Sequence, residues 1–262
     1  MLKLTPHAGN SAQAHASGAR CVRGLISTCL MAAWLCQPSF AGASGELAVA
    51  VAAPSSLAAR HADFGTEQVA PETRDIADWV VDAGDNQAMP FILVDKTAAR
   101  AYVFDVHGKL KGAATVLLGL ALGDNTVPGI GTRKLSTIRP EERTTPAGRF
   151  VASLDHNLHG EEILWIDYDA AISLHRVITS NRKEHRAARL ASASLADKRI
   201  SFGCINVPIP FYDRIVSPTF KRTSGVVYVL PETRSARTQF GAYDVDEQAR
   251  LRLAKGAVTP AP

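Results

Sequence analysis

One cysteine stands out in the segment RISFGCINVP, residues 199–208, where Cys204 lies between a glycine and an isoleucine. A cysteine is nucleophilic as its thiolate, and an imidazole partner or a helix N-terminus lowers the pKa of the thiol. Acyl transfer also needs backbone N–H donors for the oxyanion of the intermediate. Gly203 lets the backbone approach a substrate closely, and the residues after Cys204 lead into a predicted helix. The segment therefore suits a cysteine nucleophile.

The first 43 residues have the order of a secretory signal peptide. They carry three basic residues and no acidic one, then the apolar run LISTCLMAAWLC at 25–36, then the small residues Ala41, Gly42 and Ala43. The run is shorter than the roughly 20 apolar residues of a membrane-spanning helix. We expect export and cleavage after Ala43, with an uncleaved membrane anchor as the alternative.

Cleavage would leave Cys204 as the only thiol of the chain, because the other three cysteines lie before residue 43. Disulfides form in exported proteins, but a single cysteine can make no internal bridge. Cys204 is therefore either a reactive group or a small buried apolar side chain.

Charge gives no support to a nucleic-acid partner. The whole chain has 29 basic and 25 acidic residues, and removal of the signal peptide leaves 26 basic ones, a net charge of about +1. His156 and His159 have a spacing that can suit a metal, but no third ligand accompanies them. We therefore expect a polar loop there and no metal site.

The chain divides into segments by composition. Residues 44–72 are rich in alanine with proline, serine and glycine breaks, which is typical of a linker or loosely docked arm. In TRDIADWVVDAG, residues 73–84, the apolar residues share one helical face and Gly84 ends the run, so we predict a short packing helix. The expected organisation is a signal peptide at 1–43, an arm with one helix at 44–88, a main domain at 89–235 and a C-terminal tail at 236–262.

From Phe91 onward the pattern changes to short runs rich in β-branched and aromatic residues, separated by Gly, Pro, Asp or Asn. Their close succession predicts antiparallel neighbours. The segment PIPFYDRIV, 208–216, predicts a short helix with Pro210 in its first turn. The fold class expected is mainly β with a few short helices, and the predicted strands lie within 91–95, 100–106, 112–119, 148–154, 162–168, 171–177 and 225–230.

His175 is the candidate partner of Cys204. It follows the strand-like AISL, so a sheet and not a flexible loop would hold it. The alternative is a structural histidine. The other five histidines after residue 43 lie in the arm, in a turn or in polar segments: His61, His107, His156, His159 and His185.

A strand that ends in a histidine, a loop, and then S-x-G-C-[aliphatic]-[Asn or Arg] resembles the L,D-transpeptidase catalytic domain of bacterial cell-wall enzymes. The resemblance extends from about Phe91 to Pro231 through four segments: VDKTAARAYVFD, TTPAGRF at 144–150, SLHRV and ISFGCINVP. It implies a mixed β-sandwich or barrel-like fold, a catalytic domain at 89–235 and a reaction that needs no metal or organic cofactor.

The resemblance also implies roles for single residues. Cys204 would be the nucleophile and His175 its base and later acid, with the ring oriented by a neighbouring carbonyl such as that of Arg176. The amides of Gly203 and Cys204 would form the oxyanion site. The remaining site residues would shape the loop and contact substrate: Ser201, Asn206, Arg176 and Phe202.

The implied reaction takes place on peptidoglycan in the periplasm or cell envelope, with no membrane span after signal cleavage. Cys204 attacks the third residue of a tetrapeptide stem, D-alanine leaves, and an amine, water or a free D-amino acid resolves the thioester. Two other functions stay open. One is an L,D-carboxypeptidase or another cell-wall cysteine hydrolase, and the other is a non-catalytic envelope-binding module.

The chain departs from the family pattern at two places. Many members carry a second histidine where this chain has Phe202. The family often separates its histidine and cysteine by fewer than 20 residues, and here the separation is 29. The extra length contains NRKEHRAARLASASLADKR, 181–199, which predicts a lid whose arginines meet substrate carboxylates, or else a solvated face.

Overall fold

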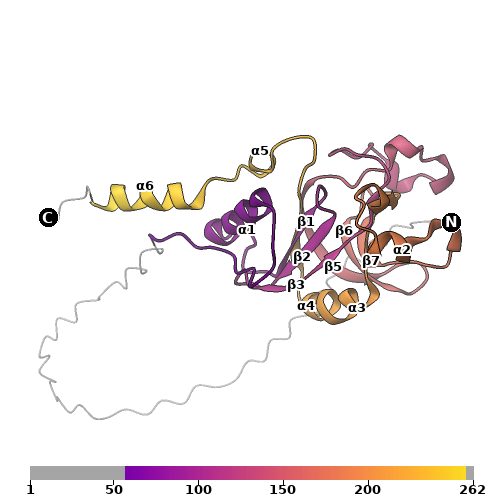
Figure 1. Ribbon diagram of the computed structural model, residues 1–262, viewed down its shortest axis with the longest axis horizontal. Helices are drawn as coiled ribbons and strands as arrows, with labels where there is room; N and C mark the ends of the chain where they lie inside the picture. Colours follow the sequence, from indigo (N-terminus) through magenta and orange to yellow (C-terminus); the bar gives the residue numbers. More distant parts are fainter. Residues whose placement is uncertain (1–56, 258–262) are drawn as a thin grey trace, which may run out of the picture. The chain divides into compact units, whose positions relative to one another are not determined.

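The computed structural model of the protein describes residues 57–257 (Figure 1). The predicted signal peptide, the first part of the expected arm and residues 258–262 lie outside the described residues. Between residues 57 and 257 no helix is both long and apolar enough to span a bilayer.

The core of the fold is an eight-stranded mixed sheet with the order β3-β2-β1-β10-β5-β6-β7-β9 (Figure 1). The chain just beyond β3 also pairs with β9, because the N–H groups of Leu117 and Asn206 each donate to the other residue's carbonyl at 2.9 Å. The two edges of the sheet therefore meet, and the sheet is nearly closed and barrel-like. Its strands are β1 (Phe91–Asp95), β2 (Arg100–Phe104), β3 (Leu110–Thr115), β5 (Gly148–His156), β6 (Glu162–Asp167), β7 (Ile172–Arg176), β9 (Ile205–Val207) and β10 (Gly225–Val229). A separate short pair joins β4 (Leu118–Gly119) and β8 (Arg199–Ser201).

The predicted fold class is confirmed, since the described chain is mainly β with short helices and each predicted run contains a strand. The expectation of antiparallel neighbours is only partly correct, because β1 pairs with β10 and β7 pairs with β9 in parallel. Parallel pairs need a long crossover connection, and the chain between β7 and β9 supplies one for the second pair. That connection contains residues 181–199.

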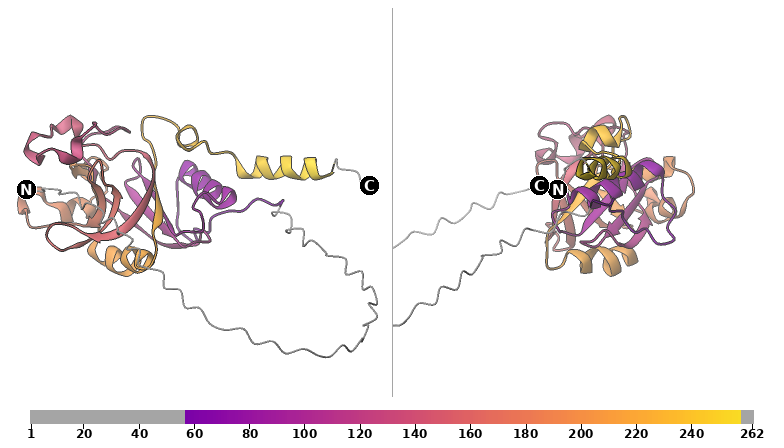
Figure 2. Two further views of the ribbon diagram at one scale, coloured as in Figure 1. Left: turned by 180° about the vertical axis from the view of Figure 1, so that it is seen from behind. Right: turned by 90° about the vertical axis from the view of Figure 1, so that its left-hand side faces the viewer.

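Strands in the middle of the sheet are buried on both faces. In β1, Ile92 and Val94 point into one apolar cluster, and Phe91 and Leu93 point into the other. A helical segment made of α3 (Ile209–Phe211), a π-helical turn (Tyr212–Val216) and α4 (Ser217–Phe220) packs into the first cluster. The second cluster is covered by α1 (Pro71–Ala83), and Figure 2 shows these helices from two further directions. The predicted helix with Pro210 in its first turn is confirmed.

The predicted helix before the sheet is α1, and it ends at Gly84 with φ +67° as the pattern indicated. Its Ile76, Trp79 and Val80 are buried. The described part of the expected tail forms α5 (Ala236–Phe240) and α6 (Val245–Ala257), both in contact with α1. Residues 57–88 and 236–257 are therefore joined by helix packing. The remaining helical segments are α2 (Arg186–Ala191) and 3₁₀ turns at Ile130–Thr132, Leu135–Thr137, Pro140–Glu142, Arg182–Glu184 and Ala196–Lys198.

Candidate active site

Cys204 lies between β8 and β9, and a strand that was not predicted separates it from the predicted helix. Residues 205–207 form β9, and α3 begins at Ile209. Ile205 and Val207 are fully buried β-branched residues whose pairing with β7 favours the strand. The helix N-terminus expected beside the thiol is therefore absent from the described site.

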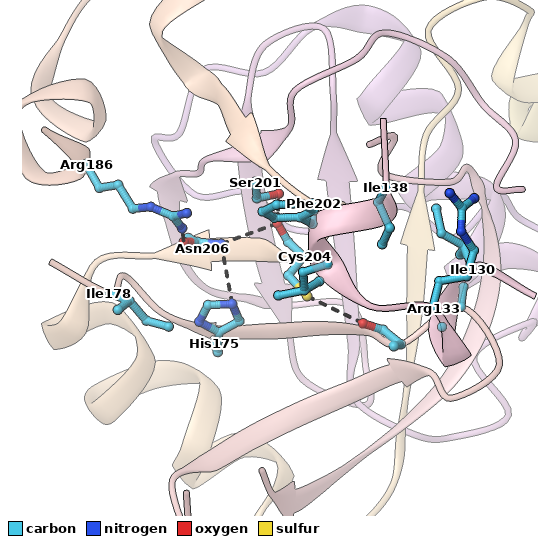
Figure 3. Close-up of a pocket in the computed structure, with 14 residues that line it drawn as sticks. Ile130, Arg133, Ile138, His175, Ile178, Arg186, Ser201, Phe202, Cys204 and Asn206 are labelled. Carbon is cyan, nitrogen blue, oxygen red and sulfur yellow. Dashed lines mark hydrogen bonds between the residues drawn. The ribbon is translucent and has the colours of Figure 1, made fainter. Parts of the chain in front are cut away.

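The parallel pairing of β7 with β9 brings the histidine and the cysteine together. His175 is in register with Asn206, two residues after Cys204. His175 Nδ1 lies 2.7 Å from the carbonyl oxygen of Arg176 and donates to it, because a carbonyl can only accept. The Nε2 atom is then the basic one, and both His175 and Cys204 line the same pocket (Figure 3).

The surroundings of the thiol favour its ionised form. Burial by itself raises the pKa of Cys204, but its interaction with His175 and hydrogen bonds from Ser173 outweigh burial and hold that pKa below the ordinary 9.0. Burial by itself lowers the pKa of His175, whereas Cys204 and the carbonyl of Arg176 raise it, so the net shift is upward from 6.5. The two shifts together favour a thiolate beside an imidazolium, which is the reactive state of cysteine nucleophiles.

The pocket around Cys204 has a volume of about 230 Å³ and mostly apolar walls. Phe202 forms part of the wall, and the guanidinium of Arg143 lies 4.0 Å from the centre of its ring. A phenyl ring at this position can shape the pocket but cannot exchange a proton. The other side chains that face the pocket include Ile130, Arg133, Leu135, Ile138, Ile178 and Arg186.

The backbone carbonyl of Arg176 orients His175, whereas the side chain of Arg176 points away from Cys204. Its guanidinium binds Asp213 at 2.7 Å and lies 4.2 Å from the centre of the Tyr212 ring. Adjacent residues of a strand point to opposite faces, so His175 and Arg176 cannot both face the cysteine. The side chain of Arg176 therefore lies outside the pocket that contains Cys204, and it borders a second pocket that His175 also lines.

Two polar side chains hold the cysteine loop. Ser201 Oγ accepts from the Gly203 N–H at 3.0 Å and donates to the Cys204 carbonyl at 2.6 Å. The fully buried Asn206 donates to the same carbonyl at 3.3 Å, and its Oδ1 accepts from Arg186 at 2.5 Å. The sequence analysis assigned the Gly203 N–H to the oxyanion site. In the structure this N–H is hydrogen-bonded to Ser201.

Sequence reasoning missed two buried residues behind the loop. Thr145 Oγ1 donates to the Gly203 carbonyl at 2.8 Å and accepts from the Gly119 N–H at 2.8 Å. The ammonium of Lys96 donates to the Thr145 carbonyl at 2.9 Å. Both lie in segments that carried the family resemblance, TTPAGRF and VDKTAARAYVFD, but nothing in those segments indicates a contact with the cysteine loop.

The segment 181–199 folds beside the pocket. Arg186 at the start of α2 lines the pocket and is bound to Glu184 at 2.5 Å as well as to Asn206. The buried Lys198 donates to three carbonyl oxygens at the end of α2, those of Arg189, Leu190 and Ser192. Most of the segment is exposed, and Arg186 is the residue of the segment that lines the pocket.

His156 and His159 lie at and just beyond the end of β5 and are exposed. Among residues 57–257, no three His, Cys, Asp or Glu side chains are placed to hold a metal ion together.

Substitution of Gly203 by alanine is expected to disrupt the cysteine loop. Gly203 has φ +129°, and an added Cβ would lie 2.6 Å from Ile172 Cδ1 and 2.7 Å from the Thr144 carbonyl oxygen. We expect Gly203→Ala to lower the free energy of unfolding by about 1–3 kcal/mol, as measured by denaturant titration. Gly160→Ala is the control, because Gly160 has φ +77° but no neighbour within 4 Å. Equal losses in the two variants would contradict the proposed crowding.

The ionisation of Cys204 predicts a pH profile. The rate of alkylation by iodoacetamide follows the thiolate fraction, which rises as the pH passes upward through the thiol pKa. Because that pKa is lowered, we expect the half-maximal rate of Cys204 at a lower pH than for a cysteine in a short unfolded peptide. A midpoint at or above that of the peptide thiol would show that burial outweighs the interaction with His175.

No family model matches the chain, and no curated protein matches it. Among solved structures, the cell shape determining protein Pgp2 from Campylobacter jejuni is 16% identical over 71% of this chain and 64% of Pgp2, with a TM-score of 0.38. This chain thus spans less than two thirds of the length of Pgp2.

Two of the other similar structures are L,D-transpeptidases. The catalytic domain from E. faecium is 19% identical over 54% of this chain and 96% of that domain, with a TM-score of 0.31. The enzyme from Mycobacterium smegmatis is 12% identical over 53% of this chain and 58% of its own, with a TM-score of 0.30. The solved structures to which the chain is similar thus include members of the family that its cysteine motif resembles.

Proposed function

We propose that the protein is an exported cysteine acyltransferase of the L,D-transpeptidase type that acts on peptidoglycan stem peptides. The observation that carries the proposal is the pair formed across β7 and β9. His175 has its Nδ1 fixed by a backbone carbonyl and faces the same pocket as Cys204, whose thiol pKa is lowered. A merely buried cysteine needs neither an oriented base nor a lowered pKa, so the pair favours an enzyme over a binding module.

The first half of the reaction forms a thioester. The Cys204 sulfur attacks the carbonyl carbon of the third stem residue, and the carbonyl π electrons move to oxygen. When the intermediate collapses, the C–N bond breaks and His175 Nε2 protonates the departing amine of D-alanine. Because Nδ1–H is fixed by the Arg176 carbonyl, both proton transfers use Nε2, which lies 3.4 Å from the side-chain nitrogen of Asn206.

The second half transfers the acyl group. His175 takes a proton from the amine of another stem, the amine nitrogen attacks the thioester carbon, and the C–S bond breaks to regenerate Cys204. Water in place of the amine would give a carboxypeptidase.

Product analysis tests the proposal. The purified protein is incubated with tetrapeptide-stem fragments of peptidoglycan, and the products are identified by mass spectrometry. Cross-linked dimers that have lost one D-alanine support transfer, and tripeptides alone support the hydrolase. Unchanged fragments in the presence of an alkylatable thiol would contradict both enzyme functions.

Export is part of the proposal, because the substrate lies outside the cytoplasmic membrane. We expect the protein recovered from the cell envelope to begin at Ser44, as measured by intact mass. A chain that retains residues 1–43 would support the membrane anchor.

A further inference from the structure

We propose that Thr145 is a positioning residue that aims the backbone N–H of Cys204 at the oxyanion, and that Lys96 holds Thr145 in place. The inference rests on the proposed function, because it requires acyl transfer at Cys204. It does not depend on which acyl donor is used.

The geometry of one peptide unit links Thr145 to Cys204. The carbonyl of Gly203 and the N–H of Cys204 belong to the same peptide bond, and the described chain contains no cis peptide. In a trans peptide these two groups point in opposite directions. Thr145 Oγ1 holds the carbonyl at 2.8 Å from a position that is fully buried. The N–H is therefore directed away from Thr145, on the side where Cys204 borders the pocket.

The backbone N–H of Cys204 is the hydrogen-bond donor of the loop that remains free to bind a substrate. The Gly203 N–H donates to Ser201 Oγ at 3.0 Å. After Cys204 the chain continues at Ile205 into strand β9, which pairs with β7. Within residues 57–257 the Cys204 N–H has no hydrogen-bond acceptor. A substrate carbonyl attacked by the adjacent sulfur would bring its oxygen to this donor.

Thr145 can act in this way because it is itself fixed. Its hydroxyl accepts from the Gly119 N–H, so the hydroxyl proton is directed to the Gly203 carbonyl. Its own carbonyl accepts from Lys96, whose ammonium is completely buried and also binds the Gly123 carbonyl at 2.6 Å and Asp124 at 2.8 Å. Glu232 lies 3.4 Å from the same ammonium and is bound by Arg199. Such a satisfied buried network holds its members in one arrangement.

The test compares two reactions of the Cys204 thiol in the full-length protein. Both are followed on the peptide that contains Cys204 by digestion and mass spectrometry, because the full-length chain has three other cysteines. Iodoacetamide is attacked at a saturated carbon and forms no oxyanion, so its rate reports only the thiolate. In p-nitrophenyl acetate the sulfur attacks a carbonyl, negative charge develops on oxygen, and p-nitrophenolate leaves as the thioester forms. Only this second reaction uses the Cys204 N–H.

We expect Thr145→Val to slow acylation by up to about 10²-fold, because the donor to the oxyanion is no longer aimed, and to change alkylation by less than about 3-fold. Thr145→Ser, which keeps the hydroxyl, should restore acylation. Lys96→Met should give the same selective loss and serves as the second variant if Thr145→Val does not fold. Asp82→Asn is the matched control, because Asp82 is also a buried polar residue and its carboxylate is bound to Arg252, 170 positions further along the chain. Both rates should stay unchanged in this variant.

Equal losses in both reactions, or no loss in a folded Thr145→Val protein, would overturn the proposal. A wild-type protein that is alkylated but never acylated by the ester would also overturn it. The outcome is separate from the choice of substrate: a selective loss with the ester, combined with no turnover of stem peptides, would support the positioning role and contradict the proposed substrate.

Discussion

Substitution of Cys204 by alanine is expected to abolish both transfer and hydrolysis of stem peptides, with a loss in rate on the order of 10⁶-fold. Cys204 is the one cysteine in the described part of the chain, and His175 would have no other thiol to activate. The hydrogen bonds that Ser201, Thr145 and Asn206 make to the loop use backbone groups of residues 203 and 204. The substitution keeps these groups, so the fold should persist. Mass spectrometry of the stem products measures the loss directly.

A control for this variant separates chemistry from folding. Cys204→Ala should retain the thermal unfolding midpoint of the wild-type protein to within a few degrees, and its uptake of iodoacetamide at residue 204 must be zero. Full activity in Cys204→Ala would contradict both enzyme functions as proposed, because each of them requires the thiol of Cys204.

Substitution of His175 by alanine is expected to lower the rate of turnover by about 10²–10⁴-fold. The variant loses the acid that protonates the leaving amine and the base that activates the acceptor. It also loses the interaction that lowers the thiol pKa, so burial should dominate and move the alkylation midpoint upward. Turnover is measured with stem fragments, and the midpoint with iodoacetamide.

The chain offers a matched control in His159, an exposed histidine just beyond the end of β5. His159→Ala should leave both the turnover and the alkylation midpoint unchanged. An alkylation midpoint in His175→Ala equal to that of the wild-type protein would show that the imidazole does not interact with the thiol.

Local patterns were sufficient to predict much of the fold. β1 spans Phe91–Asp95, the residues of the apolar run FILVD, and α1 ends at Gly84. These features depend on residues a few positions apart, whose periodicity and turn residues are visible in the sequence. The opposite orientations of His175 and Arg176 were also predictable, because strand neighbours alternate.

Other features depend on contacts between distant parts of the chain. Thr145 lies 58 positions from Gly203, and Lys96 lies 49 positions from Thr145. Neither contact leaves a periodic signal, and only the closure of the sheet brings the residues together. The strand after Cys204 escaped prediction for a similar reason. Its three residues form a strand by pairing with β7 and with Leu117, which are distant from them in the sequence.

The central claim is that Cys204 forms a thioester with the stem peptide, and the mass of the intact protein tests it most directly. The protein is mixed with a tetrapeptide-stem fragment, quenched with acid during turnover, and digested to locate any adduct. We predict a mass gain equal to the fragment minus D-alanine, located on Cys204 and removed by hydroxylamine. Turnover without an adduct on Cys204, or an adduct on a different residue, would contradict the claim.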